Sequence, residues 1–380
     1  MNDTRDRRIL GYLRPDGQLG IRNHVAIVYS VHCSYVVAQR LHDLFPAGTQ
    51  VFGVPRGCAL REPPFRKAVA LATHPNFAAG LVVGLGCEGT DAYMLADEIA
   101  KSGKPVEAIK INEEGGDLKT VEKGSRILVH LLQQASMEER AEMTPADLIV
   151  CQECGGSDAT SGLASNPVTG AAADLLIEDG GTYMHAETPE LMGCAEVLAA
   201  RAVNEQVAED ITKAIVEAEQ RSFETGRFSW GYGNILGGLT SIEEKSAGCL
   251  SKSGTKPLQG VIREFKRPPG KGYYIQIEDW EAGSFGGDPE GINQMAACGA
   301  HIGLFTTGCG STAGGLIPVI KVIANPARMQ LIEDNADFDA TPVIRGEKTI
   351  AKMGKELYEE ILAVAAGKLT KSEIYRHYEA

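Results

Sequence analysis

Short apolar runs alternate with longer segments of helical periodicity through the first 140 residues of the chain. The apolar runs that predict strands are residues 25–31, 51–54, 80–85 and 106–111. The segments that predict helices are residues 35–44, 64–72, 93–102 and 118–136. Strands that alternate with helices in this way are typical of a parallel sheet covered by helices. We therefore predict a parallel-sheet α/β domain of the Rossmann or flavodoxin-like type over residues 1–140.

A charged segment at residues 136–145 ends in Thr-Pro and predicts a boundary between two domains. The next region opens with a predicted strand and continues with both strands and helices, which glycine-rich loops separate toward the end. These elements are predicted at residues 148–153, 167–177, 181–186, 202–221, 259–265, 273–277, 301–306, 319–323 and 350–366. We expect residues 141–380 to form a second, more irregular α/β domain.

Composition and charge exclude several classes of partner and location. The net charge of −13 over 380 residues argues against nucleic acid and anionic membranes as partners, because both would repel this surface. No run approaches the ~18 apolar residues of a membrane span, and residues 1–13 lack the apolar stretch of a signal peptide. We therefore predict a soluble, cytoplasmic protein. The nine cysteines are an odd number spread along the chain, which favours reduced thiols over a disulfide framework.

Several cysteines follow directly after apolar runs. In α/β proteins, ligands bind in the crevice outside the carboxyl ends of the strands. Neutral imidazole and thiolate together suit Fe(II) or Zn(II). A half-buried structural role for the pair at positions 32 and 33 is an equal alternative. The candidate metal ligands are His32, Cys33, Cys58, Cys87 and Cys154.

Residues 84–89 match the spacing of a dinucleotide-binding turn, with Gly84, Gly86 and Gly89 between a predicted strand and a predicted helix. However, Cys87 and Glu88 would occupy the phosphate loop, and a carboxylate is a poor neighbour for pyrophosphate. Nucleotide binding is therefore the minor alternative.

A glycine-rich loop follows the strand predicted at 148–153. Successive glycines free backbone N–H groups to bind an anion, and small hydroxyls add further donors. We expect this loop to bind a substrate carboxylate, although an ordinary helix N-cap would explain the same residues. The residues concerned are Gly155, Gly156, Ser157, Asp158, Ser161 and Asn166.

A second loop of this kind, Thr306, Thr307 and Gly308, follows the strand predicted at 301–306. Beyond it, Lys321 lies inside an apolar run, where a lysine either reaches out at an edge or acts as a functional cation. Glu187 ends another predicted strand and is a candidate acid or base.

A series of motifs in the same order resembles the altronate/galactarate dehydratase family. The motifs are Gly-Tyr at 11–12, Gly-Ile-Arg-Asn at 20–23, Ser-Val-His-Cys at 30–33, Gly-Leu-Gly-Cys-Glu at 84–88 and Cys-Gly-Gly-Ser-Asp at 154–158, with further matches at 201–205, 237–239, 252–254, 305–308, 318–321 and 346–350. The resemblance extends from Gly11 to about Lys368 and includes the beta subunit of (2R)-sulfolactate sulfo-lyase.

The resemblance implies an iron(II)-dependent lyase, with another divalent metal as the alternative, that removes water from a sugar acid. Such enzymes abstract the proton next to a carboxylate, stabilise the enediolate and release the β leaving group to give a 2-keto acid. A sulfo-lyase would expel sulfite instead. We expect Glu187 and Lys321 to transfer protons and Asp158 to position substrate or metal. Arg22 and Asn23 are expected to join the glycine-rich loops in binding the substrate.

Two departures from the family pattern concern the partner and the substrate. The chain begins almost at the Gly-Tyr motif, so we expect a separate small β-rich subunit and a homo- or hetero-oligomer. Cys309 stands where the family loop usually carries an arginine suited to a carboxylate or sulfonate, and Arg56 offers part of the missing charge.

Two alternative functions of another class are a nucleotide-binding oxidoreductase and a non-catalytic binding subunit. Cys194, Cys249 and Cys298 lie outside the motifs and are predicted to be core thiols.

Overall fold

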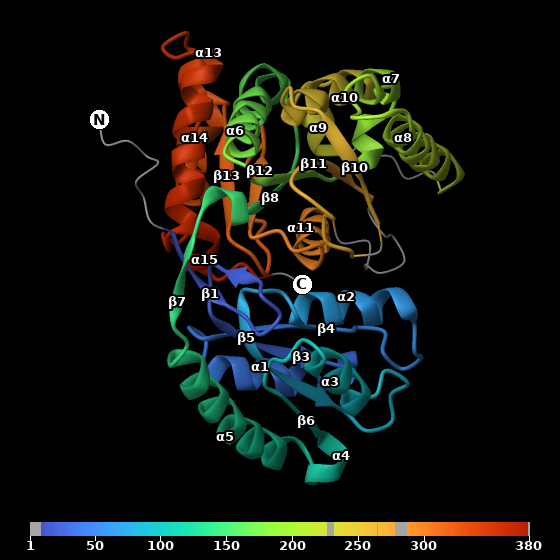
Figure 1. The fold of residues 1–380 in the computed structure, drawn as a ribbon, viewed down its shortest axis with the longest axis vertical. Helices are drawn as coiled ribbons and strands as arrows, with labels where there is room; N and C mark the ends of the chain where they lie inside the picture. Colours follow the sequence, from blue (N-terminus) through green and yellow to red (C-terminus); the bar gives the residue numbers. More distant parts are fainter. Residues whose placement is uncertain (1–8, 226–231, 264, 278–286, 379–380) are drawn as a thin grey trace. The chain divides into compact units, whose positions relative to one another are not determined.

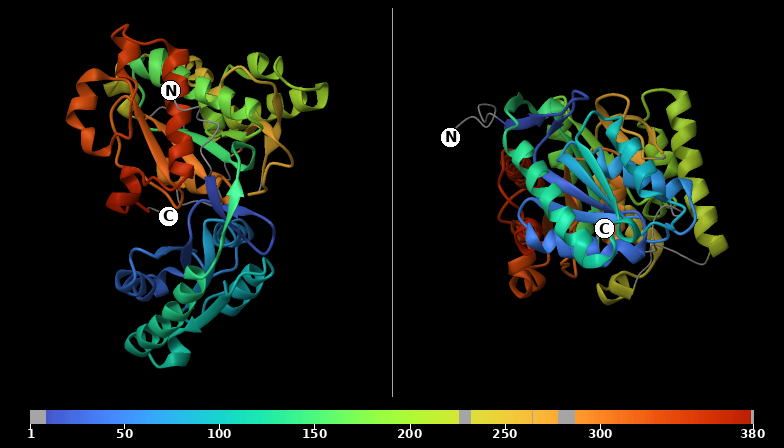
Figure 2. Two further views of the ribbon diagram at one scale, coloured as in Figure 1. Left: turned by 60° about the vertical axis from the view of Figure 1, so that its left-hand side comes forward. Right: turned by 90° about the horizontal axis from the view of Figure 1, so that it is seen from below.

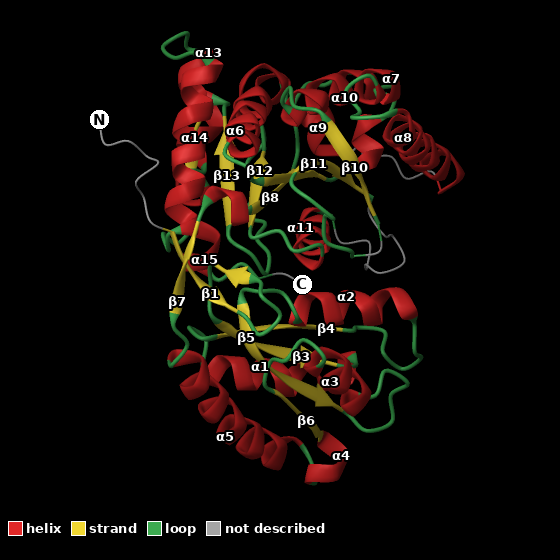
Figure 3. Ribbon diagram, in the orientation of Figure 1, coloured by secondary structure: helices red, strands yellow, loops and turns green. Residues whose placement is uncertain are grey.

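The computed structural model describes residues 9–225, 232–263, 265–277 and 287–378. They form two compact units, one of residues 9–143 and one of the described residues from 144 onward (Figure 1). Both units combine parallel sheets with covering helices, which confirms the predicted α/β class (Figures 2 and 3). Within the described ranges, no helix is long and apolar enough to cross a bilayer.

The sheet of the first unit has the strand order β4-β3-β5-β6, and all of its pairs are parallel. Its strands are β3 His24–Tyr29, β4 Thr49–Gly53, β5 Phe77–Gly84 and β6 Val106–Lys110. The helices of this unit are α1 Tyr35–Leu44, α2 Glu62–Ala72, α3 Ala92–Ala100, α4 Ile111–Glu114 and α5 Asp117–Ser136. The apolar side chains of β3 and β5 pack with those of α1 and α5 in one core, because both sheet faces are covered.

A small antiparallel sheet completes this unit, with the strand order β2-β1-β7. Its strands are β1 Ile9–Leu13, β2 Leu19–Gly20 and β7 Arg140–Met143. A Cβ atom on Gly20 would lie 2.0 Å from the carbonyl oxygen of Pro75, so only glycine allows the chain to pass so close. The buried Arg14 donates to the same carbonyl at 2.7 Å and forms an ion pair with Glu138. These contacts join the small sheet to the turn before β5.

The second unit is built on a seven-stranded parallel sheet of order β10-β11-β9-β8-β12-β13-β14. The strands are β8 Ile149–Cys154, β9 Thr182–His185, β10 Leu258–Ile262, β11 Gly272–Gln276, β12 Ile302–Thr306, β13 Val319–Ile323 and β14 Phe338–Asp339. The helices are α6 Asn166–Glu178, α7 Ala195–Ala199, α8 Glu205–Thr225, α9 Tyr232–Leu236, α10 Ile242–Leu250, α11 Asp288–Ala297, α12 Pro326–Leu331, α13 Thr341–Ile344, α14 Ile350–Ala365 and α15 Lys371–Tyr375.

The central strand β8 and its neighbour β9 lead to the candidate site, because both end where the parallel strands open to ligands. All six residues of β8 are buried, including the polar Gln152 and Glu153. Helix α14 lies close against α6, and a Cβ atom on Gly354 would come within 2.5 Å of that of Ala171. Helices therefore cover the sheet tightly beside the loops that carry the polar residues.

Candidate active site

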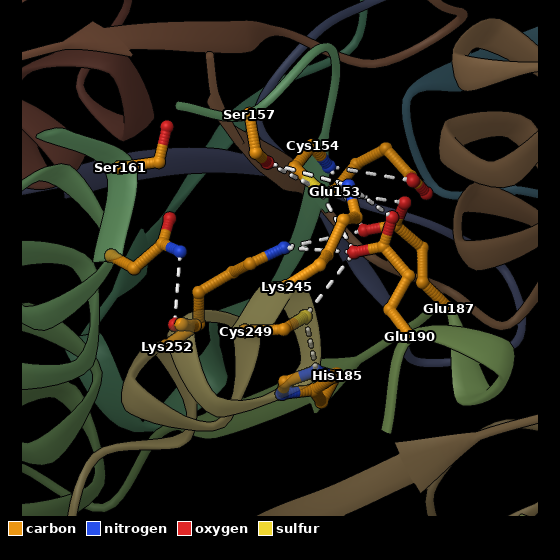
Figure 4. A network of polar contacts seen from close by, with 12 residues as sticks. Glu153, Cys154, Ser157, Ser161, His185, Glu187, Glu190, Lys245, Cys249 and Lys252 are labelled. Atoms are coloured by element: carbon orange, nitrogen blue, oxygen red, sulfur yellow. Dashed lines mark hydrogen bonds and ion pairs between the residues drawn. The ribbon is translucent and has the colours of Figure 1, made fainter. Parts of the chain in front are cut away.

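Three buried acidic and thiol side chains meet at the carboxyl ends of β8 and β9. Cys154 is the last residue of β8, whereas Glu187 and Glu190 follow β9. One ligand atom of each residue lies within 4.8 Å of the others, and this is the one group of potential metal ligands in the described part of the chain. Figure 4 shows the three side chains pointing toward one another. We call Cys154, Glu187 and Glu190 the acidic triad.

The triad is held together by direct contacts. The Sγ atom of Cys154 lies 2.9 Å from Oε2 of Glu190 and 3.6 Å from Oε1 of Glu187. The backbone N–H of Cys154 donates to Oε2 of Glu187 at 3.0 Å. Glu187 adopts a left-handed backbone conformation with φ of 59°, which costs free energy in a residue other than glycine. The turn after β9 is therefore strained at the residue whose carboxyl group reaches Cys154.

Two buried lysines from α10 and the turn after it neutralise the triad. Nζ of Lys245 lies 2.7 Å from Oε1 of Glu190 and 3.6 Å from Sγ of Cys154. Nζ of Lys252 lies 3.3 Å from Oε2 of Glu187 and 3.6 Å from Oε2 of Glu190. The two lysine side chains are 3% and 0% exposed, and charges buried to this extent are stable in proteins only when they are paired.

This environment shifts the pKa values of the triad in opposite directions. The hydrogen bond from the Cys249 thiol, helped by the two ammonium groups, lowers the pKa of Cys154 to about 5 against the effect of burial. Burial alone would raise the pKa of Glu190, but Lys245 and Lys252 lower it to about 2. Burial raises the pKa of Glu187 well above its usual value, and the neighbouring anions add to the shift. At neutral pH the site thus holds a thiolate, a carboxylate and a protonated carboxyl group.

A neutral histidine supports the triad from the end of β9. Nδ1 of His185 lies 3.1 Å from the hydroxyl of Tyr273, and Nε2 lies 3.8 Å from Sγ of Cys249. Cys249 in turn donates to Oε2 of Glu190 at 3.2 Å. Burial, with the nearby Lys252, lowers the pKa of His185 to about 3. The imidazole is therefore neutral and orients Cys249 without adding charge.

A pocket of about 360 Å³ adjoins the triad. Both lysines and the loop after β8 contribute polar groups to its wall. Asn166 donates from Nδ2 to the carbonyl of Gly248 at 3.0 Å, while its buried Oδ1 has no hydrogen-bond partner among the described residues. A polar group buried in this way is suited to a ligand donor. The polar residues of the wall are Ser157, Asp158, Ser161, Asn166, Glu244, Lys245, Cys249 and Lys252.

The two glycine-rich loops predicted to bind substrate pack against each other. Gly155 donates its N–H to the carbonyl of Thr306 at 3.0 Å, and Gly308 donates to the carbonyl of Gly156 at 2.9 Å. The Thr307 hydroxyl also donates to the Gly156 carbonyl, at 3.3 Å. The loops after β8 and β12 therefore form one surface beside the triad, although some of their N–H groups bind each other.

Asp158 and Cys309 lie on this surface. Asp158 accepts the N–H of Ser161 at 3.0 Å and a side-chain N–H of Asn325 at 2.6 Å, which fixes its carboxylate. The thiol of Cys309 donates to the carbonyl of Gly233 at 3.3 Å. The position that the family pattern gives to an arginine thus carries a neutral group bonded to the chain itself.

Lys321, the other residue predicted to transfer protons, is buried in β13. The strand register pairs Lys321 with Phe305, whereas Cys154 pairs with Thr306. Because side chains alternate along a strand, Lys321 points to the opposite face of the sheet from Cys154. Its backbone N–H donates to Asp337 at 2.9 Å.

The remaining predicted site residues belong to the first unit. His32, Cys33, Cys58 and Cys87 lie after β3, β4 and β5, and the imidazole of His32 stacks on Tyr35. The group of potential metal ligands found in the described chain contains only Cys154 of the five predicted ligands. A site that uses three or four of the five stays a prediction.

Arg22 and Asn23 both bind backbone groups of the same unit. Nη1 of Arg22 donates to the carbonyl of Ile21 at 3.0 Å. Nδ2 of Asn23 donates to the carbonyl of Ala135 at 2.7 Å. The motif that carries these two residues thus stabilises the segment that leads into β3.

The turn with dinucleotide spacing is filled by its own carboxylate. Glu88 accepts the N–H groups of Leu85, Gly86 and Cys87 at 3.1, 2.6 and 2.9 Å, and it accepts the Ser30 hydroxyl at 2.7 Å. A pyrophosphate would need the same N–H groups. This geometry disfavours the nucleotide-binding alternative.

Four residues of the site were not predicted from the sequence. Glu190, Lys245 and Lys252 were not singled out, and Cys249 was expected to be a core thiol. Cys249 is indeed buried, yet its thiol contacts Glu190 and His185. Sequence signals existed for two of them, since Glu190 follows Glu187 by one helical turn and Lys252 opens one of the family motifs at 252–254.

Two family models match the chain. The model of the "D-galactarate/Altronate dehydratase, C-terminal" family matches residues 145–380. The model of the "D-galactarate dehydratase/Altronate hydrolase, second domain" family matches residues 11–136. The two matches together span both structural units.

Individual relatives agree with these matches. The (2R)-sulfolactate sulfo-lyase subunit beta of Chromohalobacter salexigens is 33% identical, with 99% of this chain and 97% of that protein aligned. The galactarate dehydratase (L-threo-forming) of Escherichia coli is 32% identical over 94% of this chain and 72% of its own length. The altronate dehydratase of Escherichia coli is 28% identical over 97% of this chain and 76% of its own length.

Proposed function

The chain belongs to the D-galactarate/altronate dehydratase family of lyases, and on this premise we propose that it eliminates a β leaving group from a small 2-hydroxy acid. The proposed substrate is a sugar acid, the leaving group is water and the product is a 2-keto acid. The observation that carries this proposal is the acidic triad with its two buried lysines, which also line the adjoining polar pocket.

The two lysines are suited to hold the charge that develops in the reaction. Removal of the proton next to a carboxylate creates a dianionic enediolate, which fixed cations in a water-poor site stabilise strongly. Although burial opposes it, the anionic neighbours raise the pKa of Lys245 and of Lys252, so both remain protonated. Both residues face the pocket, where a substrate carboxylate would meet them.

Glu187 is proposed to donate the proton that the leaving hydroxyl group needs. A general acid must be protonated at the working pH, and the raised pKa of Glu187 satisfies this condition. Asp158, Ser157 and Ser161 line the pocket together with the two lysines and are proposed to orient the substrate hydroxyls. Lys321, on the other face of the sheet, is the less direct candidate for proton transfer.

The acidic triad also fits a divalent metal ion. Its thiolate and carboxyl groups are buried and close enough to share one ion, and this mixture of soft and hard donors suits iron or zinc better than magnesium or calcium. We propose that the anionic Cys154 and Glu190 would hold Fe²⁺ when the protein is loaded, with Glu187 beside them as the proton donor. Such an ion supplies a Lewis acid that polarises a substrate oxygen.

The second candidate function is release of sulfite from sulfolactate. It is favoured by the relative named as a sulfo-lyase subunit beta, 97% of which aligns with this chain. The same relative supports a separate small subunit as the partner, because its name places it in an enzyme of more than one chain. Loss of sulfite needs the same enediolate and differs only in the group that leaves.

The test is a product assay on protein purified without oxygen, together with any small subunit that co-purifies. Altronate, galactarate and sulfolactate are offered in turn, and 2-keto acid and sulfite are both measured. We expect keto acid from one of the three, with loss of at least tenfold in Lys252→Met and little change in the exposed Lys213→Met. A folded, metal-loaded protein that converts none of the three substrates would refute the proposal.

A further inference from the structure

The exposed cysteines of this protein all lie at one edge of one sheet. Of the nine cysteines, Cys33, Cys58 and Cys87 are the exposed ones. They follow β3, β4 and β5, which are neighbours in the order β4-β3-β5. The carboxyl ends of parallel strands meet at the same edge. Free cysteine is normally among the most buried residues, so three exposed thiols gathered at this edge suggest a ligand.

Hydrogen bonds bring the loops of Cys58 and Cys87 together across the end of β3. The N–H of Gly89 donates to the carbonyl of Cys58 at 3.0 Å, and the N–H of Thr90 donates to the carbonyl of Gly57 at 2.9 Å. A Cβ atom on Gly57 would lie 1.8 Å from the carbonyl oxygen of Ser30, so this loop rests directly on the end of β3. The three cysteine-bearing loops are therefore in contact.

The backbone that carries these thiols is fixed. Glu88 binds the N–H of Cys87 and the hydroxyl of Ser30, which ties the turn after β5 to the end of β3. The hydroxyl of Ser34, next to Cys33, donates to the carbonyl of Val83 at 2.8 Å. The thiols thus project from braced turns, as the ligands of a cofactor do.

Each of the three cysteines also precedes a helix. Cys33 comes just before α1, Cys58 before α2 and Cys87 before α3. The N-terminal end of a helix carries a partial positive charge, which favours thiolates and anionic cofactors nearby. All three helices follow strands whose carboxyl ends form this edge.

Three thiols at one sheet edge fit a cluster held by cysteines. Among the described residues, the group of ligand atoms that lie within 4.8 Å of one another is the acidic triad, so the three thiols are not placed as the ligands of one ion. An iron–sulfur cluster contains several irons bridged by sulfide and therefore spaces its cysteine ligands further apart. We infer that Cys33, Cys58 and Cys87 bind a [4Fe–4S] cluster through three of its irons. Such a cluster would have one iron without a cysteine ligand, which could take a small oxygen ligand.

The inference is tested on the full chain, purified or reconstituted anaerobically with ferrous iron and sulfide. Acid-labile sulfide is expected with an equal amount of iron from the cluster, beyond any ion held at the acidic triad, and with the visible absorption of a cluster. Cys33→Ser, Cys58→Ser and Cys87→Ser should each lose most of the labile sulfide. These variants should still fold, because all three side chains are exposed, and circular dichroism checks this. The matched control Cys194→Ser, at a cysteine of the other unit, should retain the sulfide.

The open iron has its own readout. Ferricyanide should take one electron from [4Fe–4S]²⁺, which releases Fe²⁺ and leaves [3Fe–4S]⁺ with its electron paramagnetic resonance signal. A reconstituted protein without labile sulfide, or one that binds a stoichiometric zinc ion instead, would overturn the inference. The variant Cys154→Ala separates the cluster inference from the proposed function, because it should keep the cluster and lose lyase activity. Loss of lyase activity alone therefore does not contradict the cluster assignment.

Discussion

Substitution of Lys245 by methionine tests whether the site is held by buried charge. The change keeps most of the side-chain volume but removes the ammonium group 2.7 Å from Glu190, in a pair whose side chains are 3% and 4% exposed. Removal of one partner from a buried ion pair costs about 3–5 kcal/mol, because the other charge is left without compensation. At about 2–4 °C per kcal/mol for a unit of this size, the melting temperature should fall by about 6–20 °C.

Differential scanning calorimetry with chemical denaturation measures the effect, and Lys213→Met is the matched control. Lys213 lies on α8 with its side chain 70% exposed, and its nearest carboxylate oxygen, on Glu217, is 3.8 Å away. Exposed pairs of this kind contribute about 0–1 kcal/mol, so the control should melt close to the wild type. The double variant Lys245→Met with Glu190→Gln should be more stable than the sum of the single effects, because it removes both members of the pair.

The reasoning would be wrong if Lys245→Met unfolded within about 1 kcal/mol of the wild type, as exposed pairs do. That result would mean that the pair is not ionised in the folded protein or that water reaches it. A large loss in both Lys245→Met and the Lys213→Met control would instead show that the method reports on lysine content rather than on burial.

Three further predictions concern other contacts. Cys249→Ala should lower metal affinity or activity by roughly 10–100-fold, because its thiol donates a hydrogen bond to Glu190. Metal titration and product formation measure the two effects, and an unchanged affinity and rate would refute the prediction. Gly20→Ala should destabilise its unit by about 1–3 kcal/mol in denaturant unfolding, because the added Cβ atom would overlap the carbonyl oxygen of Pro75. The control Gly80→Ala should cost less, because its Cβ atom would meet no other atom within 3.7 Å. Equal losses of stability in the two variants would contradict this reasoning. Asn76→Leu should cost about 1–3 kcal/mol, because its side-chain oxygen accepts two backbone N–H groups, and a neutral effect would show that water replaces it.

The parallel strands could be predicted because each is an apolar run with polar or glycine-rich ends. The strand β5 is buried along its whole length and coincides with the predicted run at 80–85, extended by three residues at its start. By contrast, β1 and β7 alternate buried and exposed positions over only five and four residues. Such short, half-exposed strands carry little pattern of their own and are defined by the partner with which they pair.

Half of the candidate site could be predicted for the same reason. Cys154 and Glu187 stand at or just beyond the ends of buried strands, where the position alone marks them. Lys245 and Lys252 reach the triad from α10 and the turn after it, far along the sequence from β8. Apart from the family motif that Lys252 opens, nothing in their local pattern distinguishes them from solvated lysines. Only the tertiary packing that buries them shows that their charge must be compensated.

The cysteines carry the strongest argument for two sites rather than one. Their common position after apolar runs makes Cys33, Cys58, Cys87 and Cys154 predicted ligand candidates, together with His32, and three or four of the five are expected to bind one metal ion. In the structure, Cys154 is a buried thiolate between carboxyl groups and two ammonium groups, whereas the other three thiols are exposed on a different unit. The buried thiolate suits a lone Lewis acid, and the exposed thiols suit a larger cofactor. We therefore propose different chemistry for the two sets, which the product assay and the sulfide analysis measure independently.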